Sequence, residues 1–186
     1  MTTILIIVIA LILTAGVYFY NRLVGSRNRV STAWSDIDVQ LQRRHDLIPR
    51  LVTAVDQYAS YEKATLEAVT VLRTEAMQTT DIRAKGKLEE KLSAGLARII
   101  ALAENYPDLK ANENFLNLQN ELVETENYLQ FARRYYNGSV RDYNTMTETV
   151  PSNIIAAWFD FKQKDFFQKK SDEAANVPLV DLGTVE

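Results

Sequence analysis

Four residue types are absent or scarce in this 186-residue chain, which has no cysteine, six glycines, four prolines and one histidine, His45. Without thiols, disulfide scaffolds, thiolate metal sites and cysteine nucleophiles are excluded. One histidine is too few for the two Glu-x-x-His motifs of a carboxylate-bridged di-iron bundle, and the residue three positions before it is Gln42. The chain also has no glycine-rich phosphate loop and no G-x-S-x-G turn. We therefore expect no enzymatic activity, no catalytic residue, no metal and no cofactor.

A strong excess of one charge is also missing, because the net charge is only −3, and no nucleic-acid partner is expected. The charges are nevertheless distributed unevenly. Residues 22–50 carry six arginines and three aspartates, whereas residues 171–186 carry four acidic side chains and no basic one. The latter stretch contains Pro178 and Gly183 and has little apolar area. We therefore predict a disordered acidic tail over residues 171–186.

Charged side chains are missing from residues 1–21, and residues 4–20 are apolar apart from a threonine, a glycine and two tyrosines. At about 1.5 Å per helical residue, this run extends roughly 26 Å, close to the hydrocarbon thickness of a bilayer. Three aromatic residues at positions 18–20 fall where an interfacial aromatic belt is expected. A cleaved signal peptide needs a basic residue before the run and a small-residue cleavage site after it, and neither is found. We predict a retained transmembrane anchor over residues 1–22, in contact with the lipid bilayer through residues 4–20.

Three arginines, Arg22, Arg27 and Arg29, follow the apolar run, and no charged side chain precedes it. Basic residues close to a membrane span lie preferentially on its cytoplasmic side. The absence of cysteine agrees with a reducing compartment. We therefore predict a single-pass membrane protein with its N-terminus outside and its main domain in the cytoplasm.

Apolar residues recur in steps of three and four through most of the remaining chain, which indicates amphipathic helices. Residues 27–78 contain no glycine and a single proline, and they predict one helix of roughly 70 Å or more. A second helix is predicted from Asp81 to before Pro107, and a third from near Asn112 to before Pro151. No segment shows the alternation that is typical of a strand.

The third predicted helix contains Asn137-Gly138, a turn signal that leaves a kink or break there as an alternative. A short helix from residue 152 to about residue 159 is predicted to follow it. The expected fold is all-α, with an N-terminal transmembrane helix followed by an elongated antiparallel bundle of three long helices plus a short C-terminal helix. The bundle is expected to occupy residues 23–170.

A polar cluster at residues 43–46, together with Asp38, interrupts the apolar stripe of the first bundle helix. Because Pro49 has no N–H group, we expect a kink there and a free carbonyl on His45. Either the arginines of the cluster bind an anion or a partner's carboxylate, or the cluster is satisfied by acidic residues of another helix, which is the interpretation we favour. Three acidic residues of the third helix, Glu121, Glu124 and Glu126, are expected to face solvent. The candidate interaction cluster consists of Asp38, Arg43, Arg44, His45 and Asp46.

Two aromatic features lie near the C-terminus. Tyr136-Asn137 and Tyr143-Asn144 repeat at a spacing of seven, which places both pairs on one side of a helix. They either fix the register across the bundle through their amide groups or pack in the core, and we favour core packing. The aromatic residues between 158 and 167 lie among lysines. They either cover the open end of the bundle, which we favour, or lie on an anionic membrane surface.

Several stretches match a known family, among them residues 33–35, 37–41, 43–49 and 106–110, with the two Tyr-Asn pairs. Together they resemble the LemA family of bacterial membrane proteins, which have one N-terminal membrane helix and a long helical domain. The resemblance runs from about Tyr20 to Phe167 and implies an outward N-terminus and an inward C-terminal domain. Relatives include a magnetosome-membrane protein. The family offers no established biochemical activity, so no catalytic residue is carried over. Two positions depart from the family pattern: Arg50 stands where many members have asparagine, and Asp160 where members often have glycine. The run at residues 43–49 is highly specific.

These observations predict a membrane-anchored helical scaffold of the bacterial cytoplasmic (inner) membrane that acts through protein partners or through self-association. An adaptor that regulates a membrane protease or a signalling kinase is the first alternative. An enzyme or small-ligand sensor built on His45 is the second.

Overall fold

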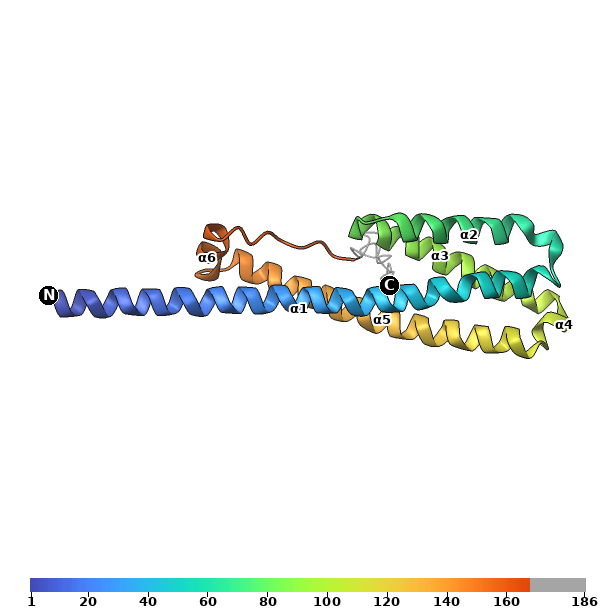
Figure 1. Ribbon diagram of the computed structural model, residues 1–186, viewed down its shortest axis with the longest axis horizontal. Coiled ribbons are helices and arrows are strands. Elements are labelled where there is room, and N and C mark those ends of the chain that lie inside the picture. The colour runs from blue at the N-terminus through green and yellow to red at the C-terminus, as the bar shows by residue number, and fades with distance from the viewer. Residues whose placement is uncertain (168–186) are drawn as a thin grey trace, which may run out of the picture.

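The computed structural model describes residues 1–167, and all regular secondary structure in that part of the chain is helical (Figure 1). Two long helices, α1 (Thr2–Asp56) and α5 (Glu113–Glu148), lie along the molecule. A hairpin of α2 (Lys63–Gln78) and α3 (Ile82–Leu102) packs beside them at one end. The predicted all-α class is confirmed, and the predicted acidic tail lies outside the described residues.

Shorter elements connect the long helices. η1 (Ser60–Glu62) joins α1 to α2, while η2 (Ala103–Asn105) and α4 (Pro107–Lys110) join α3 to α5. At the other end α6 (Ser152–Trp158) follows α5, which confirms the predicted short helix. Residues 161–167 then run back along the bundle as an extended segment, which we call the strap (Figure 1).

The N-terminal part of α1 projects beyond the rest of the molecule (Figure 1). An 18-residue window of α1 has a mean hydropathy of 2.5, and none of that window is buried against other parts of the chain. A helix that is apolar on all sides and uncovered by protein needs an apolar solvent. By length and composition α1 can therefore cross a bilayer once, as the predicted anchor requires.

The single helix predicted over residues 27–78 is wrong, because the chain turns between α1 and α2. α1 ends at Asp56, and Ala59 has left the helical region with φ −125° and ψ 49°. Val55 and Ala59 are both 0% exposed, so the turn packs into the bundle. Packing of this turn against the other helices outweighs an apolar periodicity that runs through it unbroken. Four long helices rather than three therefore surround the core at this end.

α1 continues through Pro49 as a helix. The His45 carbonyl, which Pro49 leaves without its helical donor, accepts a hydrogen bond from Arg73 Nε at 2.7 Å. The carbonyl that the sequence predicts to be free is thus occupied by a side chain of α2. This bond replaces the missing backbone donor and ties α1 to the hairpin.

Two of the predicted helix starts are confirmed by their caps. The side chains of Asp81 and Asn112 each accept a hydrogen bond from the backbone N–H three residues later, at 2.7 and 3.1 Å. α5 is continuous across Asn137-Gly138, so the alternative of a break there is wrong.

Within residues 1–167 the buried apolar residues form two clusters, and we name the two halves of the bundle after them. The distal cluster joins α1, α2, α3, α4 and α5, and the proximal cluster joins α1, α5, α6 and the strap. The distal cluster includes Leu47, Leu51, Val55, Val69, Leu92, Ile99 and Phe115. The proximal cluster includes Leu23, Val30, Ile37, Leu41, Leu129, Tyr136, Tyr143 and Phe167.

Candidate functional site

A layer of buried charges lies between the two apolar clusters. Arg44 on α1 is 1% exposed, and its guanidinium pairs with the fully buried Glu89 carboxylate of α3. It also donates hydrogen bonds to Ser93 Oγ at 2.8 Å and to Glu126 Oε2 of α5 at 2.9 Å. One side chain thereby joins three helices, and we call this group of residues, together with His45 and Arg133, the charged layer.

His45 binds the other oxygen of the same carboxylate. Its Nε2 lies 2.9 Å from Glu89 Oε1, and because a carboxylate only accepts, the ring nitrogen is the donor. Burial alone raises the pKa of the Glu89 carboxyl. The hydrogen bond from His45 and the charge of Arg44 outweigh this effect and hold the pKa below its usual value of 4.5. Glu89 is therefore an ionised acceptor that two α1 side chains clamp.

Arg133 of α5 completes the charged layer from the strap side. It is 8% exposed, and its Nε and Nη2 are buried without a hydrogen-bond partner. Burial, followed by the nearby charge of Arg44, lowers the pKa of its guanidinium below the usual value for arginine. Its cation stacks over the Phe167 ring with 5.2 Å to the centroid, which offsets part of the lost hydration.

The structure brings together only two of the five residues in the predicted cluster. Arg44 and His45 meet acidic residues of α3 and α5. This is the arrangement expected if acidic residues of other helices satisfy the cluster. Arg43 lies on the surface and pairs with Glu124 at 3.1 Å. Asp38 and Asp46 are also exposed. Asp38 Oδ1 lies 4.0 Å from Lys85 Nζ, and Asp46 Oδ1 accepts a hydrogen bond from Gln42 Nε2 at 2.9 Å. Whether these exposed residues bind a partner stays a prediction.

Three charged members of the layer were not predicted from the sequence. Glu126 was expected to face solvent with Glu121 and Glu124, but its side chain is only 34% exposed and its carboxylate pairs with Arg44. Glu89 lies three residues before Leu92 on the buried stripe of α3, and Arg133 lies four residues after Leu129 on that of α5. Charged residues in register with an apolar stripe are the signal that could have found them.

The two Tyr-Asn pairs of α5 hold the strap rather than another helix. Tyr136 Oη donates to the Asp165 carbonyl at 2.8 Å, and Tyr143 Oη donates to the Lys162 carbonyl at 3.0 Å. Asn144 binds both backbone groups of Lys164 at 2.9 Å. Asn137 Oδ1 accepts from the backbone N–H of Phe167 at 3.0 Å. The rings pack in the core as we favoured, while the amides fix the register of the strap.

Burial acts on both tyrosine hydroxyl groups. It raises the pKa of Tyr136 to about 12, and the neighbouring Asp165 carboxylate adds to this shift. Burial also raises the pKa of Tyr143. Both hydroxyls are therefore neutral donors at ordinary pH.

An exposed aromatic groove lies between α1 and α5 and has a volume of about 360 Å³. Tyr128, Phe131 and Tyr135 are 50%, 63% and 54% exposed, and Val39 of α1 is 63% exposed. The amide oxygen of Gln40, which lines the groove, is buried without a hydrogen-bond partner. Large apolar side chains gathered on one surface are typical of a protein interface.

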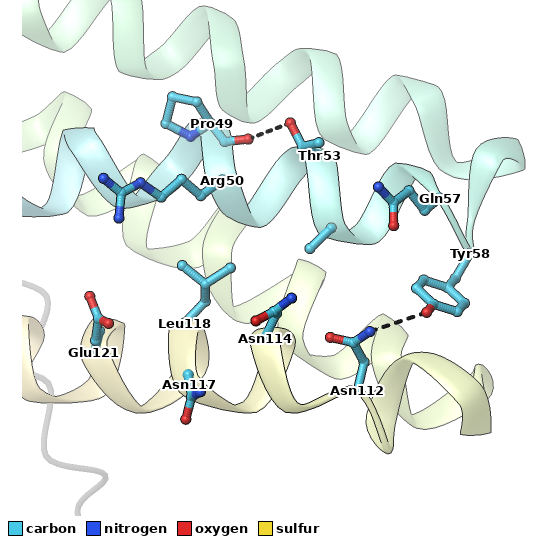
Figure 2. A pocket seen from close by; sticks show the side chains of 11 residues that line it. Pro49, Arg50, Thr53, Gln57, Tyr58, Asn112, Asn114, Asn117, Leu118 and Glu121 are labelled. Carbon is cyan, nitrogen blue, oxygen red and sulfur yellow. Dashed lines mark hydrogen bonds between the residues drawn. The ribbon is translucent and has the colours of Figure 1, made fainter.

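A second groove, of about 670 Å³, lies at the distal end between the last turns of α1 and the first turns of α5 (Figure 2). Most of its lining side chains are amides or other uncharged polar groups, and Tyr58 Oη accepts a hydrogen bond from Asn112 at 3.1 Å across one end (Figure 2). Within residues 1–167, no three His, Asp or Glu side chains are grouped so that they could hold a metal ion. The expectation that the chain has no metal, cofactor or enzymatic activity stays a prediction.

The fold and these sites define a class of protein, a helical bundle with one apolar N-terminal helix long enough to span a membrane. The LemA family model matches residues 33–182, so the chain belongs to the LemA family. It is 25% identical to "Protein LemA" of Metamycoplasma hominis in an alignment of 182 residues that covers 94% of this chain and 81% of that protein. It is also 25% identical to "Magnetosome protein MamQ 2" of Paramagnetospirillum magneticum over 87% of this chain and 68% of the relative. "Magnetosome protein MamQ" of Magnetospirillum gryphiswaldense is 21% identical over the same shares.

Proposed function

We propose that the chain is a membrane-anchored helical scaffold that binds proteins, and that self-association is the interaction its exposed aromatic groove supports best. The observation that carries this proposal is the continuity of α1. One helix of 55 residues contains the apolar span and also contributes to both apolar clusters of the bundle. The anchor and the bundle therefore form one rigid unit that holds its surfaces at fixed heights above a membrane.

The aromatic groove supports self-association for a geometric reason. Two copies anchored in one membrane share the same orientation, so their grooves lie at the same height and can face each other about a twofold axis. The groove offers Tyr128, Phe131 and Tyr135, and Arg134 lies over the Phe131 ring at 4.7 Å. Tyrosine, phenylalanine and arginine are enriched in the buried centres of protein interfaces.

The molecular mass of the full chain in detergent or nanodiscs tests this proposal. We expect a dimer or larger assembly that dissociates in the double variant Phe131→Ala and Tyr135→Ala. Val123→Ala is the matched control, because Val123 is also exposed on α5 at 52% but lies outside the groove. A monomeric unmodified chain, or an assembly that both variants leave intact, would contradict self-association through the groove. A stoichiometric foreign partner that needs the groove would instead favour an adaptor.

We further propose that the bundle lies in the cytoplasm. The support is the set of arginines immediately after the span, Arg22, Arg27 and Arg29, all of which are exposed. A reporter that is active only in the cytoplasm, fused after Glu186, is expected to be active. Activity of a periplasm-only reporter at the same position would reverse the orientation and leave the anchor intact.

A further inference from the structure

The short helix α6 lies against the end of the apolar span rather than above it. A Cβ placed on Gly16 would lie 3.9 Å from Ile155 Cδ1, which is an ordinary contact distance. The Tyr20 ring packs against Phe159, with 4.8 Å between the ring centroids. Gly16 is four residues before Tyr20, so α6 reaches about 6 Å back along the span from its aromatic end. A membrane that covers residues 4–20 of α1 must therefore also meet α6.

The outer surface of α6 is apolar at this level. Ser152 and Ala156 face inward and are buried. Facing outward, Ile154 is 60% exposed and Trp158 is 82% exposed. The flanking residues Val150 and Phe159 are 77% and 58% exposed. In water these large apolar side chains would be left uncovered, whereas exposed tryptophan and phenylalanine are typical of helices that lie in the membrane interface.

Basic side chains lie just beyond this apolar group, on the bundle side. Arg22 and Arg29 are exposed and line a groove of about 500 Å³ between α1 and α5. They lie two and nine residues after Tyr20, which places them about 3 and 14 Å further along the helix, within reach of lipid headgroups. Arg27 is also exposed and stacks over Phe161 at 5.2 Å. Asp142 of the same groove pairs with Arg141 at 3.6 Å, and Lys162 pairs with Asp160 at 3.4 Å, so these two pairs cancel and the arginines of α1 add positive charge.

We infer that α6, with Val150 and Phe159, is a second membrane contact that inserts into the interfacial layer of an anionic bilayer. The apolar side chains enter the acyl boundary while the arginines of α1 bind the headgroup phosphates. This contact fixes the depth of the span and holds the proximal end of the bundle at the lipid surface. The inference rests on the proposed anchoring by α1 and adds a lipid-binding surface to it.

The chain has no cysteine, so single cysteines can report the position of each segment. Three full-length variants, Ile154→Cys, Val123→Cys and Leu11→Cys, are reconstituted into vesicles that contain anionic and zwitterionic lipids. A membrane-impermeant maleimide is then added. All three native side chains are exposed within the protein, at 60%, 52% and 65%. Val123→Cys is the control for a water-exposed site and for vesicle orientation, and Leu11→Cys is the control for the span.

We expect Ile154→Cys to react about ten-fold or more slowly than Val123→Cys, because thiols in the acyl boundary do not meet the polar reagent. Ile154→Cys that reacts as fast as Val123→Cys, with Leu11→Cys still protected, would overturn the inference and leave the anchor in place. Reaction at Leu11→Cys as fast as at Val123→Cys would instead overturn the anchor and the proposed function with it.

Tryptophan fluorescence distinguishes lipid from protein as the covering partner. Trp34→Phe leaves Trp158 as the only tryptophan, and Trp158→Phe leaves Trp34, which packs between Tyr136 and Phe167 in the bundle. Lipids brominated near the headgroup are expected to quench Trp158 and to leave Trp34 unchanged. A protected Ile154→Cys without quenching of Trp158 would show that a second copy or another membrane protein covers α6. Equal quenching in anionic and purely zwitterionic vesicles would overturn the role of the arginines.

Discussion

The two halves of the bundle are stabilised in different ways. In the distal half, four long helices enclose a core in which Leu51, Val55, Leu92 and Ile99 are completely buried. In the proximal half of the described residues, α6 and the strap accompany α1 and α5, and α3 contributes only its first residue, Ile82, to the packing (Figure 1). Two helices cannot cover both sides of a shared core, so an extended segment supplies the missing wall. Side-chain hydrogen bonds from α5 hold that wall in place of a third helix.

The charged layer lies at the junction of the two halves. Along α1, Leu41 belongs to the proximal cluster and Leu47 to the distal one, with Arg44 and His45 between them. A shift of α1 against α3 by one turn would leave Glu89 buried without its partners, which costs several kcal/mol. We therefore interpret the layer as the feature that fixes the register between the halves.

The largest expected effect is the loss of this junction. Glu89→Gln removes the carboxylate that clamps Arg44 and His45, and we expect it to lower the free energy of unfolding by about 3–5 kcal/mol. Glu124→Gln removes the exposed partner of Arg43 and should cost about 0–1 kcal/mol. Denaturant unfolding of the full chain in detergent measures both. Equal costs for the two variants would show that the charged layer does not join the halves.

Glycine substitutions sharpen the contrast in packing. A Cβ at Gly95 of α3 would lie 2.8 Å from Cγ2 of Val69, which is 1% exposed and cannot move away, whereas a Cβ at Gly138 of α5 meets nothing within 4 Å. We expect Gly95→Ala to destabilise the distal half by about 1–3 kcal/mol through overpacking. Gly138→Ala should stabilise α5 by about 0.5–1 kcal/mol, since alanine favours the helix. The same unfolding experiment checks both signs, and a stabilising Gly95→Ala would contradict the tight packing of α2 on α3.

Removing a strap hydrogen bond should have a smaller and more local effect. Tyr136→Phe leaves the buried ring and deletes the hydroxyl that donates to the Asp165 carbonyl, so we expect a loss of about 0.5–1.5 kcal/mol. Tyr128→Phe is the control, because that hydroxyl belongs to an exposed residue. Hydrogen exchange in the strap should accelerate in the first variant alone. An equal change in both variants would show that the Tyr136 hydrogen bond does not hold the strap.

Alkaline pH should have the smallest effect, and it acts on the same Tyr136 hydroxyl. The folded-state pKa of Tyr136 is about 12, above the ordinary value of 10, so its contribution to stability is complete below pH 10. The contribution is lost as the pH rises from 10 through 12. Ultraviolet absorbance of tyrosinate in the unmodified chain and in Tyr136→Phe should differ by one tyrosine, which ionises near pH 12. Ionisation of every tyrosine near pH 10 would contradict the burial of the Tyr136 hydroxyl.

The sequence predicts those parts of the fold that depend on neighbouring residues. The apolar run of α1, the stripes of the bundle helices and the caps at Asp81 and Asn112 are all local signals, and the structure has each of them. The turn after Asp56 was missed because the apolar pattern continues through it. Contacts with other helices, which no local pattern contains, decide where the chain reverses.

The candidate site was predicted only in part for the same reason. Arg44 and His45 stand out because they interrupt an apolar stripe, but their partner Glu89 is more than forty residues away in sequence. The strap has neither helical nor strand periodicity, and its backbone is ordered by Tyr136, Tyr143 and Asn144 of another element. The Tyr-Asn repeat therefore indicated that one face of α5 mattered without indicating what it binds.

We infer that a closed four-helix core stabilises the distal half, while the strap and the membrane stabilise the proximal half. Hydrogen exchange of the unmodified full chain in anionic vesicles and in detergent measures the stability of each half separately. We predict that α2 and α3 exchange slowly and equally in both media, because they open only with global unfolding. In detergent, α6 and the strap should exchange faster than α2 and α3, and the bilayer should slow them. Two results would contradict this difference between the halves. In detergent, α6 and the strap could exchange as slowly as α2 and α3, or their exchange could be the same in detergent and in the bilayer.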